Sequence, residues 1–147
     1  MLHDITNNQL LRTPQYCGDI NATGQRHGFG TLTYPDGSSF KGTWSEGLPE
    51  GHGELTRRRG DGSLGYVGEW HRGKRHGYGT QRWADGAEYN GEWHGDHMDG
   101  HGKHSFGSGA VYEGEWRGGV RHGVGLYWAP GDPHAVESRW IDNKRVW

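Results

Sequence analysis

The chain has little of what usually builds a globular core or a membrane anchor. Its 147 residues include one cysteine and two methionines, and only 30% of them are apolar. The lone Cys17 excludes a disulfide framework within the chain. No apolar run approaches the roughly 20 residues that cross a bilayer, so we expect no transmembrane helix. An apolar content this low predicts disorder unless another feature compensates for it.

The sequence also lacks an excess of charge of either sign. Sixteen lysines and arginines face 18 aspartates and glutamates, which leaves a net charge of -2. Nucleic-acid-binding domains usually carry a strong positive excess, so nothing here predicts a nucleic acid partner. Residues 1–15 lack the basic start and apolar stretch of a secretory signal. We therefore expect a cytoplasmic protein, in agreement with the unpaired cysteine.

Motifs of catalysis are absent as well. Glycine pairs such as Gly28 and Gly30 are followed by no Gly-Lys-Ser or Gly-Lys-Thr, which a phosphate-binding loop requires. No serine lies in a nucleophile elbow, and the carboxylates are spread along the chain instead of converging. We expect no catalytic residue, no cofactor and no enzymatic activity.

What the chain has in abundance is glycine and large aromatic residues. It contains 29 glycines, eight tryptophans and seven tyrosines. They recur about every 23 residues as an aromatic, a glycine two positions on and a tryptophan two further. This motif stands at Phe40-Gly42-Trp44, Tyr66-Gly68-Trp70, Tyr89-Gly91-Trp93 and Tyr112-Gly114-Trp116. Such a period predicts one small supersecondary unit repeated along the chain.

The second half of each unit is equally regular. A Gly-x-Gly step follows each tryptophan, as at Gly77 and Gly79, and a turn closes the unit, as at Tyr34-Pro35-Asp36-Gly37. Asp-Gly between two β-prone runs indicates a tight turn, because glycine accepts positive φ and aspartate caps its own turn. Each unit should therefore be a β-hairpin.

The spacing within the motif predicts two different sheet faces. Residues two apart in a strand share a face, so Tyr66, Gly68 and Trp70 should point one way and Val67 and Glu69 the other. Each buried ring removes about 150 to 250 Å² from water. Rings stacked from unit to unit can thus replace an aliphatic core, with glycines leaving room for a neighbouring ring or backbone.

The consensus of the MORN-repeat family is similar to the third unit of this chain, which reads Tyr66-Val67-Gly68-Glu69-Trp70-His71-Arg72-Gly73-Lys74-Arg75-His76-Gly77-Tyr78-Gly79. The resemblance covers about residues 16 to 147. It implies an all-β fold, an elongated single-layer antiparallel sheet of consecutive hairpins with degenerate caps. We assign 1–15 to an N-terminal arm or cap, 16–132 to five repeats and 133–147 to a partial capping repeat without a second strand.

The resemblance implies a non-enzymatic scaffold or adaptor, since the family is used mainly for protein contacts and assembly. The aromatic face should offer a groove for a helix or peptide of another protein. Neighbouring hairpins could instead bury the rings as core, and we expect both: the inner part packs and the outer edge binds. The expected groove residues are Phe40, Trp44, Tyr66, Trp70, Tyr89, Trp93, Tyr112, Trp116 and Trp140.

Related repeats occur in radial spoke heads and cytoskeletal scaffolds, so the resemblance also implies a component of a cytoskeletal or ciliary (axonemal) assembly. The open edges of such a sheet add a homodimer as a second mode of contact. The alternative is a membrane-contact module that binds anionic phospholipid through basic turn residues. The residues for that contact are Arg57, Arg58, Arg59, Lys74 and Arg75. We favour the simpler explanation of these charges, which is a solvated loop together with the turn charges usual in the family.

Eleven histidines raise the question of a metal site. His94, His97, His101 and His104 belong to one hairpin, and a turn around Asp96 to Met98 would make His94 and His101 cross-strand neighbours. Strand parity places His101 and His104 on opposite faces, however. We favour scattered surface histidines and assign no metal.

One consensus position alternates between imidazole and carboxylate. It reads His27, Glu50, His76, Asp99 and His122 along the chain. Equivalent positions should lie two strands apart, roughly 10 Å, which allows water bridges or field effects but no direct bond. We hypothesise that this ladder tunes the turn edge and makes it sensitive to acidification.

Overall fold

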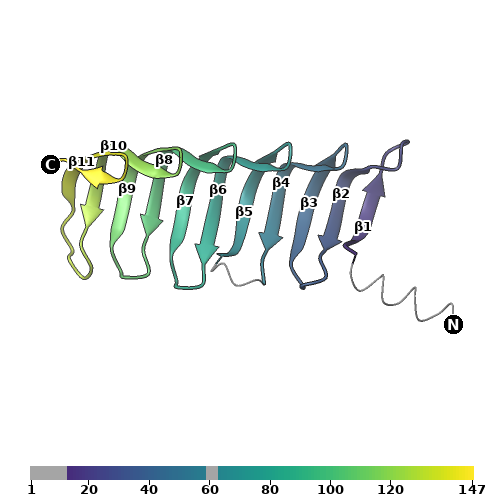
Figure 1. Cartoon of the computed structure of the whole chain (residues 1–147), viewed down its shortest axis with the longest axis horizontal. Coiled ribbons are helices and arrows are strands. Elements are labelled where there is room, and N and C mark those ends of the chain that lie inside the picture. Colours follow the sequence, from purple (N-terminus) through teal and green to yellow (C-terminus); the bar gives the residue numbers. More distant parts are fainter. Residues whose placement is uncertain (1–12, 59–62) are drawn as a thin grey trace.

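The computed structural model describes residues 13–58 and 63–147, which form one elongated, twisted sheet (Figure 1). Twelve strands follow one another in chain order, and each pairs with the next in antiparallel orientation. The strands are β1 (Gln15–Ile20), β2 (Arg26–Thr33), β3 (Ser39–Ser45), β4 (Leu48–Thr56), β5 (Ser63–His71), β6 (Lys74–Trp83), β7 (Glu88–His94), β8 (His97–Ser105), β9 (Val111–Arg117), β10 (Val120–Trp128), β11 (Val136–Ile141) and β12 (Lys144–Arg145). The expected all-β, single-layer array of hairpins is confirmed. Within these residues, no helix could span a membrane.

Two kinds of tight turn alternate along the sheet. At one end of the strands, two-residue turns such as Arg72-Gly73 join the halves of a repeat, and both residues have positive φ, 48° and 78°. Positive φ at both positions is what a type I′ hairpin turn requires. At the other end, turns join successive repeats, and two of those in the described residues contain Asp-Gly, at Asp36-Gly37 and Asp85-Gly86. There the Gly37 N–H donates to the Tyr34 carbonyl at 2.9 Å, and Asp36 accepts from the Ser38 N–H at 2.8 Å.

The core is a continuous row of rings on one side of the sheet, which we call the aromatic face. The Tyr66 ring contacts Trp70 of its own strand and Trp93 of the next repeat, with centroids 5.1 and 5.3 Å apart and planes almost perpendicular. The same edge-to-face contacts join Tyr89 to Trp93 and Trp116. Aromatic pairs prefer this geometry, so each repeat is locked to the next by its rings.

The polar atoms of these rings bond the backbone beneath them. The indole N–H groups of Trp44, Trp70, Trp93 and Trp116 each donate to a glycine carbonyl on the strand before, at 3.1 Å. The Tyr66 hydroxyl donates to the Glu69 carbonyl at 3.0 Å. Buried polar groups are costly unless they are paired, so these bonds set both the position and the tilt of each ring.

The C-terminal end differs from the expectation in one respect. A second strand does follow Trp140, the two-residue β12, whose Arg145 pairs with Trp140 and Lys144 with Ile141. The strand forms because Asp142 and Asn143 adopt φ of 47° and 68°, the same turn geometry as in the other hairpins. Residues 1–12, most of the expected arm, lie outside the described residues.

Candidate interaction groove

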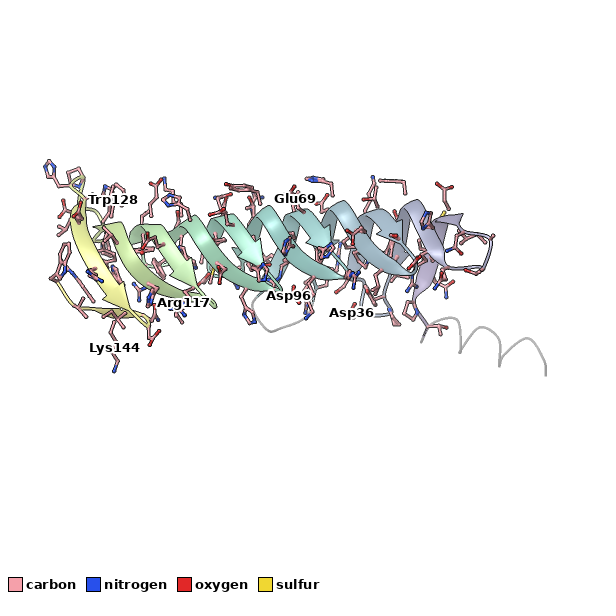
Figure 2. The ribbon with its side chains drawn as sticks, turned by 90° about the horizontal axis from the view of Figure 1, so that it is seen from above. Asp36, Glu69, Asp96, Arg117, Trp128 and Lys144 are labelled. Atoms are coloured by element: carbon pink, nitrogen blue, oxygen red, sulfur yellow. The ribbon has the colours of Figure 1, made fainter. Side chains whose placement is uncertain are left out.

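A groove of about 790 Å³ lies on the aromatic face, over the first half of the sheet. Its apolar walls include Leu32, Leu48, Leu55 and Trp83. Arg26, Arg57 and Arg75 line it together with Asp36 and Asp96. Figure 2 shows Asp36 and Asp96 on one side of the ribbon and Glu69 on the other, which we call the polar face.

All nine predicted groove residues lie on the aromatic face, but their rings are buried more completely than we expected. The exposed fraction is 0% for Tyr89 and Tyr112 and at most 7% for Trp70 and Trp140. The rings therefore form the floor beneath the groove. Whether a partner reaches their outer edges stays a prediction.

Part of the apolar walls comes from partly buried residues that we did not predict from the sequence. They occupy two positions of each repeat, two and four residues after the Gly-x-Gly step, and include Leu55 and Trp83. Both positions share the strand face of the aromatic motif. Parity within the repeat was the signal that could have identified them.

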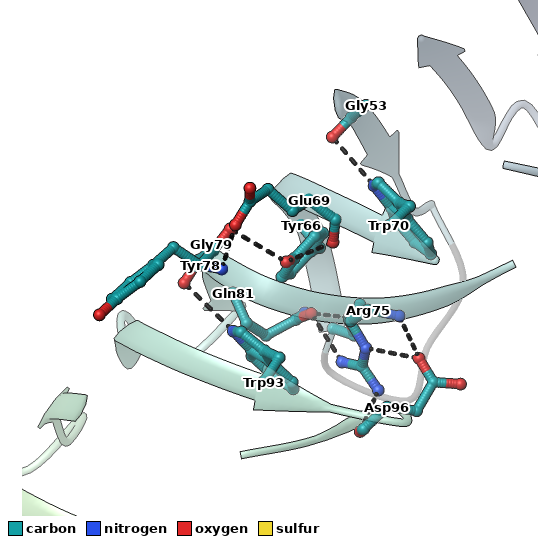
Figure 3. A network of polar contacts seen from close by, with 11 residues as sticks. Gly53, Tyr66, Glu69, Trp70, Arg75, Tyr78, Gly79, Gln81, Trp93 and Asp96 are labelled. Carbon is teal, nitrogen blue, oxygen red and sulfur yellow. Dashed lines mark hydrogen bonds and ion pairs between the residues drawn. The ribbon is translucent and has the colours of Figure 1, made fainter. Parts of the chain in front are cut away.

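Arg75 is the charged residue with the most contacts in the groove (Figure 3). Its Nε lies 3.1 Å from a carboxylate oxygen of Asp96, and its Nη2 donates to the Asp96 carbonyl at 3.0 Å. Nη1 donates to the Gln81 amide oxygen at 3.0 Å. The guanidinium also lies over the Trp93 ring, 4.5 Å from its centroid. Every edge of this cation has a partner within the chain.

The position of Arg75 alternates from repeat to repeat. Strands β2, β6 and β10 carry the segments Arg26-His27-Gly28-Phe29-Gly30, Arg75-His76-Gly77-Tyr78-Gly79 and Arg121-His122-Gly123-Val124-Gly125. Strands β4 and β8 carry Pro49-Glu50-Gly51-His52-Gly53 and Met98-Asp99-Gly100-His101-Gly102. We call these the arginine-type and acidic-type strands. The alternation of imidazole with carboxylate was predicted from the sequence, whereas the accompanying alternation of arginine with Pro49 and Met98 was not.

The repeats match the family model described as "MORN repeat" at residues 24–39, 40–62, 66–88, 89–111 and 112–132. The chain belongs to the MORN-repeat family. Among curated proteins, it is similar to alsin of Rattus norvegicus, 38% identical over 66 residues, and to alsin of Homo sapiens, 36% identical over 66 residues. Each match covers 44% of this MORN-repeat chain and 4% of alsin, so the chain spans only a small part of these relatives.

The ladder of imidazoles and carboxylates bonds the turns of the MORN hairpins. Glu50 accepts from the Arg72 N–H at 2.8 Å, and Asp99 accepts from the Gly118 N–H at 3.2 Å. The His27 ring nitrogen faces the Glu46 N–H at 3.4 Å. The bond from the Arg72 N–H, followed by the His71 ring, lowers the pKa of Glu50. Three of the five ladder residues, His27, Glu50 and Asp99, thus contact the turn of the next hairpin directly, and the sensitivity of this edge to acidification stays a prediction.

The expected pairing of His94 with His101 is wrong. The turn is Gly95-Asp96, so His94 pairs with His97 and His101 lies opposite Glu115. Aspartate at a positive φ of 73° allows this turn to lie earlier than we expected. No group of three or more metal-ligating side chains is assembled in residues 13–58 and 63–147.

His104 lies apart from the other histidines of its hairpin, on the aromatic face. Its ring packs against Phe106 and Trp83, with centroids 4.2 and 5.3 Å away. Burial lowers the pKa of His104, and the nearby Arg121 lowers it further. The parity argument, which separated His101 from His104, is confirmed.

The basic residues considered for lipid contact do not form one patch. Arg57 and Arg58 follow the end of β4, whereas Lys74 and Arg75 begin β6 at the opposite end of the strands. Lys74 and Arg75 point to opposite faces, and Arg75 is paired with Asp96. Arg59 lies outside the described residues.

Proposed function

We propose that this MORN-repeat chain is a non-enzymatic scaffold or adaptor that binds a segment of another protein along its aromatic face. The observation that supports it is the groove, which continues across several repeats with apolar walls and a floor of rings. An open groove of this shape fits a helix or an extended peptide. Exposed groove residues such as Tyr34 and Leu48, at 37% and 49%, are available to such a ligand.

The interlocked rings make the groove suitable for binding. Tyr66, Tyr89 and Tyr112 are at most 1% exposed, and each touches two tryptophans. A floor that is already ordered loses little conformational entropy when a partner binds. The partner would gain affinity from burying the apolar walls against this fixed surface.

The proposed cellular role is that of a structural component in a cytoskeletal or ciliary assembly of the radial-spoke type, in the cytoplasm. The family resemblance supports this role, and the open edge strand β1 offers a further contact, including a homodimer. Fractionation of the tagged protein tests it. Retention through detergent and release by high salt is expected, and release by detergent alone would instead support the membrane alternative.

Two groove substitutions test the binding mode. Tyr34→Glu and Leu48→Glu place a carboxylate on exposed groove positions, so the fold should persist while partners captured from the native cell are lost. Val67→Glu is the matched control, because Val67 is 45% exposed on the polar face. Equal capture by all three variants and the wild type would contradict the proposed groove.

A further inference from the structure

The strands present charges of only one sign to the aromatic face. The side chains concerned are Arg26, Arg75 and Arg121 of the arginine-type strands, and Arg145 of β12, which lies opposite Trp140. Within the described residues, no strand presents a carboxylate to this face, and aspartates reach the groove only from turns, at Asp36 and Asp96. The aromatic face therefore carries four strand cations. Arg26 and Arg75 line the groove together with Arg57, which follows β4, whereas Arg121 and Arg145 lie beyond the end of the groove.

Of Arg26, Arg75 and Arg121, only Arg75 has a carboxylate partner in the part of the chain that the structure describes. Asp96 pairs with Arg75, but the equivalent turn residue is Gly47 beside Arg26 and Asn143 beside Arg121. Arg26 donates one hydrogen bond, to the Gly47 carbonyl at 3.3 Å, and its covered Nε has no acceptor. Arg121 donates to the neutral amide oxygen of Asn143 at 2.6 Å. Arg26 and Arg121 thus lack the carboxylate that Arg75 has.

The two guanidinium groups are nevertheless held in place. Arg26 lies over the Trp44 ring at 4.9 Å and Arg121 over the Trp140 ring at 3.9 Å. A guanidinium that is fixed on a ring presents its planar fork in one orientation, which suits bidentate pairing with a carboxylate. Partly buried cations without a counter-charge also favour the arrival of an anion.

We propose that the segment bound along the aromatic face is acidic and that its carboxylates bind Arg26 and Arg121. This inference rests on the proposed groove function and specifies the chemistry of the partner. The middle of the segment, over Arg75 and its partner Asp96, is uncharged and apolar. It packs against groove walls such as Leu55 and Trp83.

The strand order sets the spacing of the acidic groups. Strands β2 and β10 are eight positions apart in the sheet, 10 minus 2. At about 4.8 Å per strand this corresponds to roughly 38 Å. A helical partner covers that span with about 26 residues and an extended one with about 12. We therefore expect two acidic clusters separated by that length.

Two substitutions supply the missing carboxylates from within the chain. Gly47→Asp and Asn143→Asp copy Asp96, and the three positions share positive φ of 86°, 68° and 73°, so the turns accommodate the change. Asn143→Asp alters only one atom of the side chain. Gly119→Asp is the matched control, because Gly119, at φ of 88°, is the equivalent turn residue beside Met98 of an acidic-type strand.

The test uses random 30-residue peptides displayed on phage and selected on the full chain. Selected peptides should be enriched in aspartate and glutamate near both ends. The double variant Gly47→Asp/Asn143→Asp should bind them about tenfold more weakly or worse. The double variant adds two negative charges, whereas Gly119→Asp and the single variant Asn143→Asp add one each. Of these two single variants, only Asn143→Asp should bind the peptides more weakly than the wild type.

Four results would overturn the proposal. The first result is a set of peptides that lose affinity for the Leu48→Glu variant but show no acidic enrichment. The second is a set of peptides that lose affinity for Leu48→Glu but bind the double variant as tightly as the wild type. Either result would support the groove function and refute the acidic partner. Peptides that are insensitive to Leu48→Glu would refute both. Binding of phosphatidylserine vesicles that the double variant abolishes, without acidic peptides, would assign the arginines to lipid headgroups instead.

Discussion

The ring of Tyr66 lies directly over Gly79 of the neighbouring strand, so closely that a Cβ on this glycine would overlap the phenol (Figure 3). The same relationship joins Tyr89 to Gly102 and Tyr112 to Gly125. The second glycine of each Gly-x-Gly step therefore leaves the space that the tyrosine or phenylalanine ring of the preceding strand occupies. This explains how a chain with so little aliphatic material buries a core.

Gly79→Ala should lower the free energy of unfolding by about 1 to 3 kcal/mol, because the methyl group must displace the Tyr66 ring. Urea unfolding followed by tryptophan fluorescence measures the loss. Tyr78→Phe, at the preceding residue on the other face, is the control and should change stability by less than about 0.5 kcal/mol, because Tyr78 is 65% exposed. A Gly79→Ala protein as stable as this control would show that the ring can move aside at little cost.

Trp93→Phe and Trp140→Phe should differ in their effect on stability. The Trp93 indole donates to the Gly79 carbonyl at 3.1 Å, whereas the buried Trp140 N–H has no acceptor. Removing the first donor leaves the partly buried Gly79 carbonyl without this bond, which costs about 1 kcal/mol, and removing the second leaves no acceptor unpaired. Thermal unfolding of both variants compares them. Equal losses would mean that the indole hydrogen bonds contribute little.

His104 should make the fold less stable in mild acid. Burial lowers the pKa of His104 in the folded state, so below the ordinary value of 6.5 the unfolded chain takes up a proton that the folded chain refuses. The free energy of unfolding therefore falls as the pH drops from 6.5 until the folded-state pKa is passed.

His104→Leu tests this pH dependence, because Leu32 and Leu55 occupy the equivalent position of other repeats. The difference in melting temperature between pH 7.5 and pH 5 should be smaller in this variant than in the wild type. His101→Leu, on the exposed polar face, should keep the wild-type difference. The same pH dependence in all three proteins would assign the effect to other groups.

The Arg75–Asp96 pair should contribute a modest, salt-dependent coupling. Their side chains are 27% and 42% exposed, so solvent screens part of the attraction. A double-mutant cycle with Arg75→Met and Asp96→Asn should give about 0.5 to 1 kcal/mol at low salt and less in 1 M salt. Methionine suits this position, since Met98 stands there in an acidic-type strand. A coupling near zero would mean that the ion pair orients Arg75 without stabilising the sheet.

Much of the architecture was predictable because it is encoded locally. The alternation of Tyr66, Gly68 and Trp70 determines which face is aromatic, and the 23-residue period determines that one hairpin follows another. Turn residues such as Asp36 and Gly37 mark where strands end. The face alternation and the turn signals act within a few residues, and the period follows from comparing the repeats, so all three can be obtained from the sequence alone.

The contacts that shape the groove join residues of different repeats. Arg75 meets Asp96, which is 21 residues away, and the opposition of Trp70 to Arg75 follows from an irregularity in the β5–β6 pairing after Gly68. Such an irregularity changes which residues face each other on the two strands. The pairing partners therefore cannot be found by counting residues outward from the turn.

The sequence by itself determined that this protein is a row of β-hairpins with one aromatic face, because strand periodicity and turn chemistry are local properties. Only the tertiary structure decided that the rings are buried as a floor, that Asp96 neutralises Arg75, and that Arg26 and Arg121 have no such partner. Burial and charge pairing depend on which side chains of neighbouring repeats meet, and that is settled by the packing of one hairpin against the next.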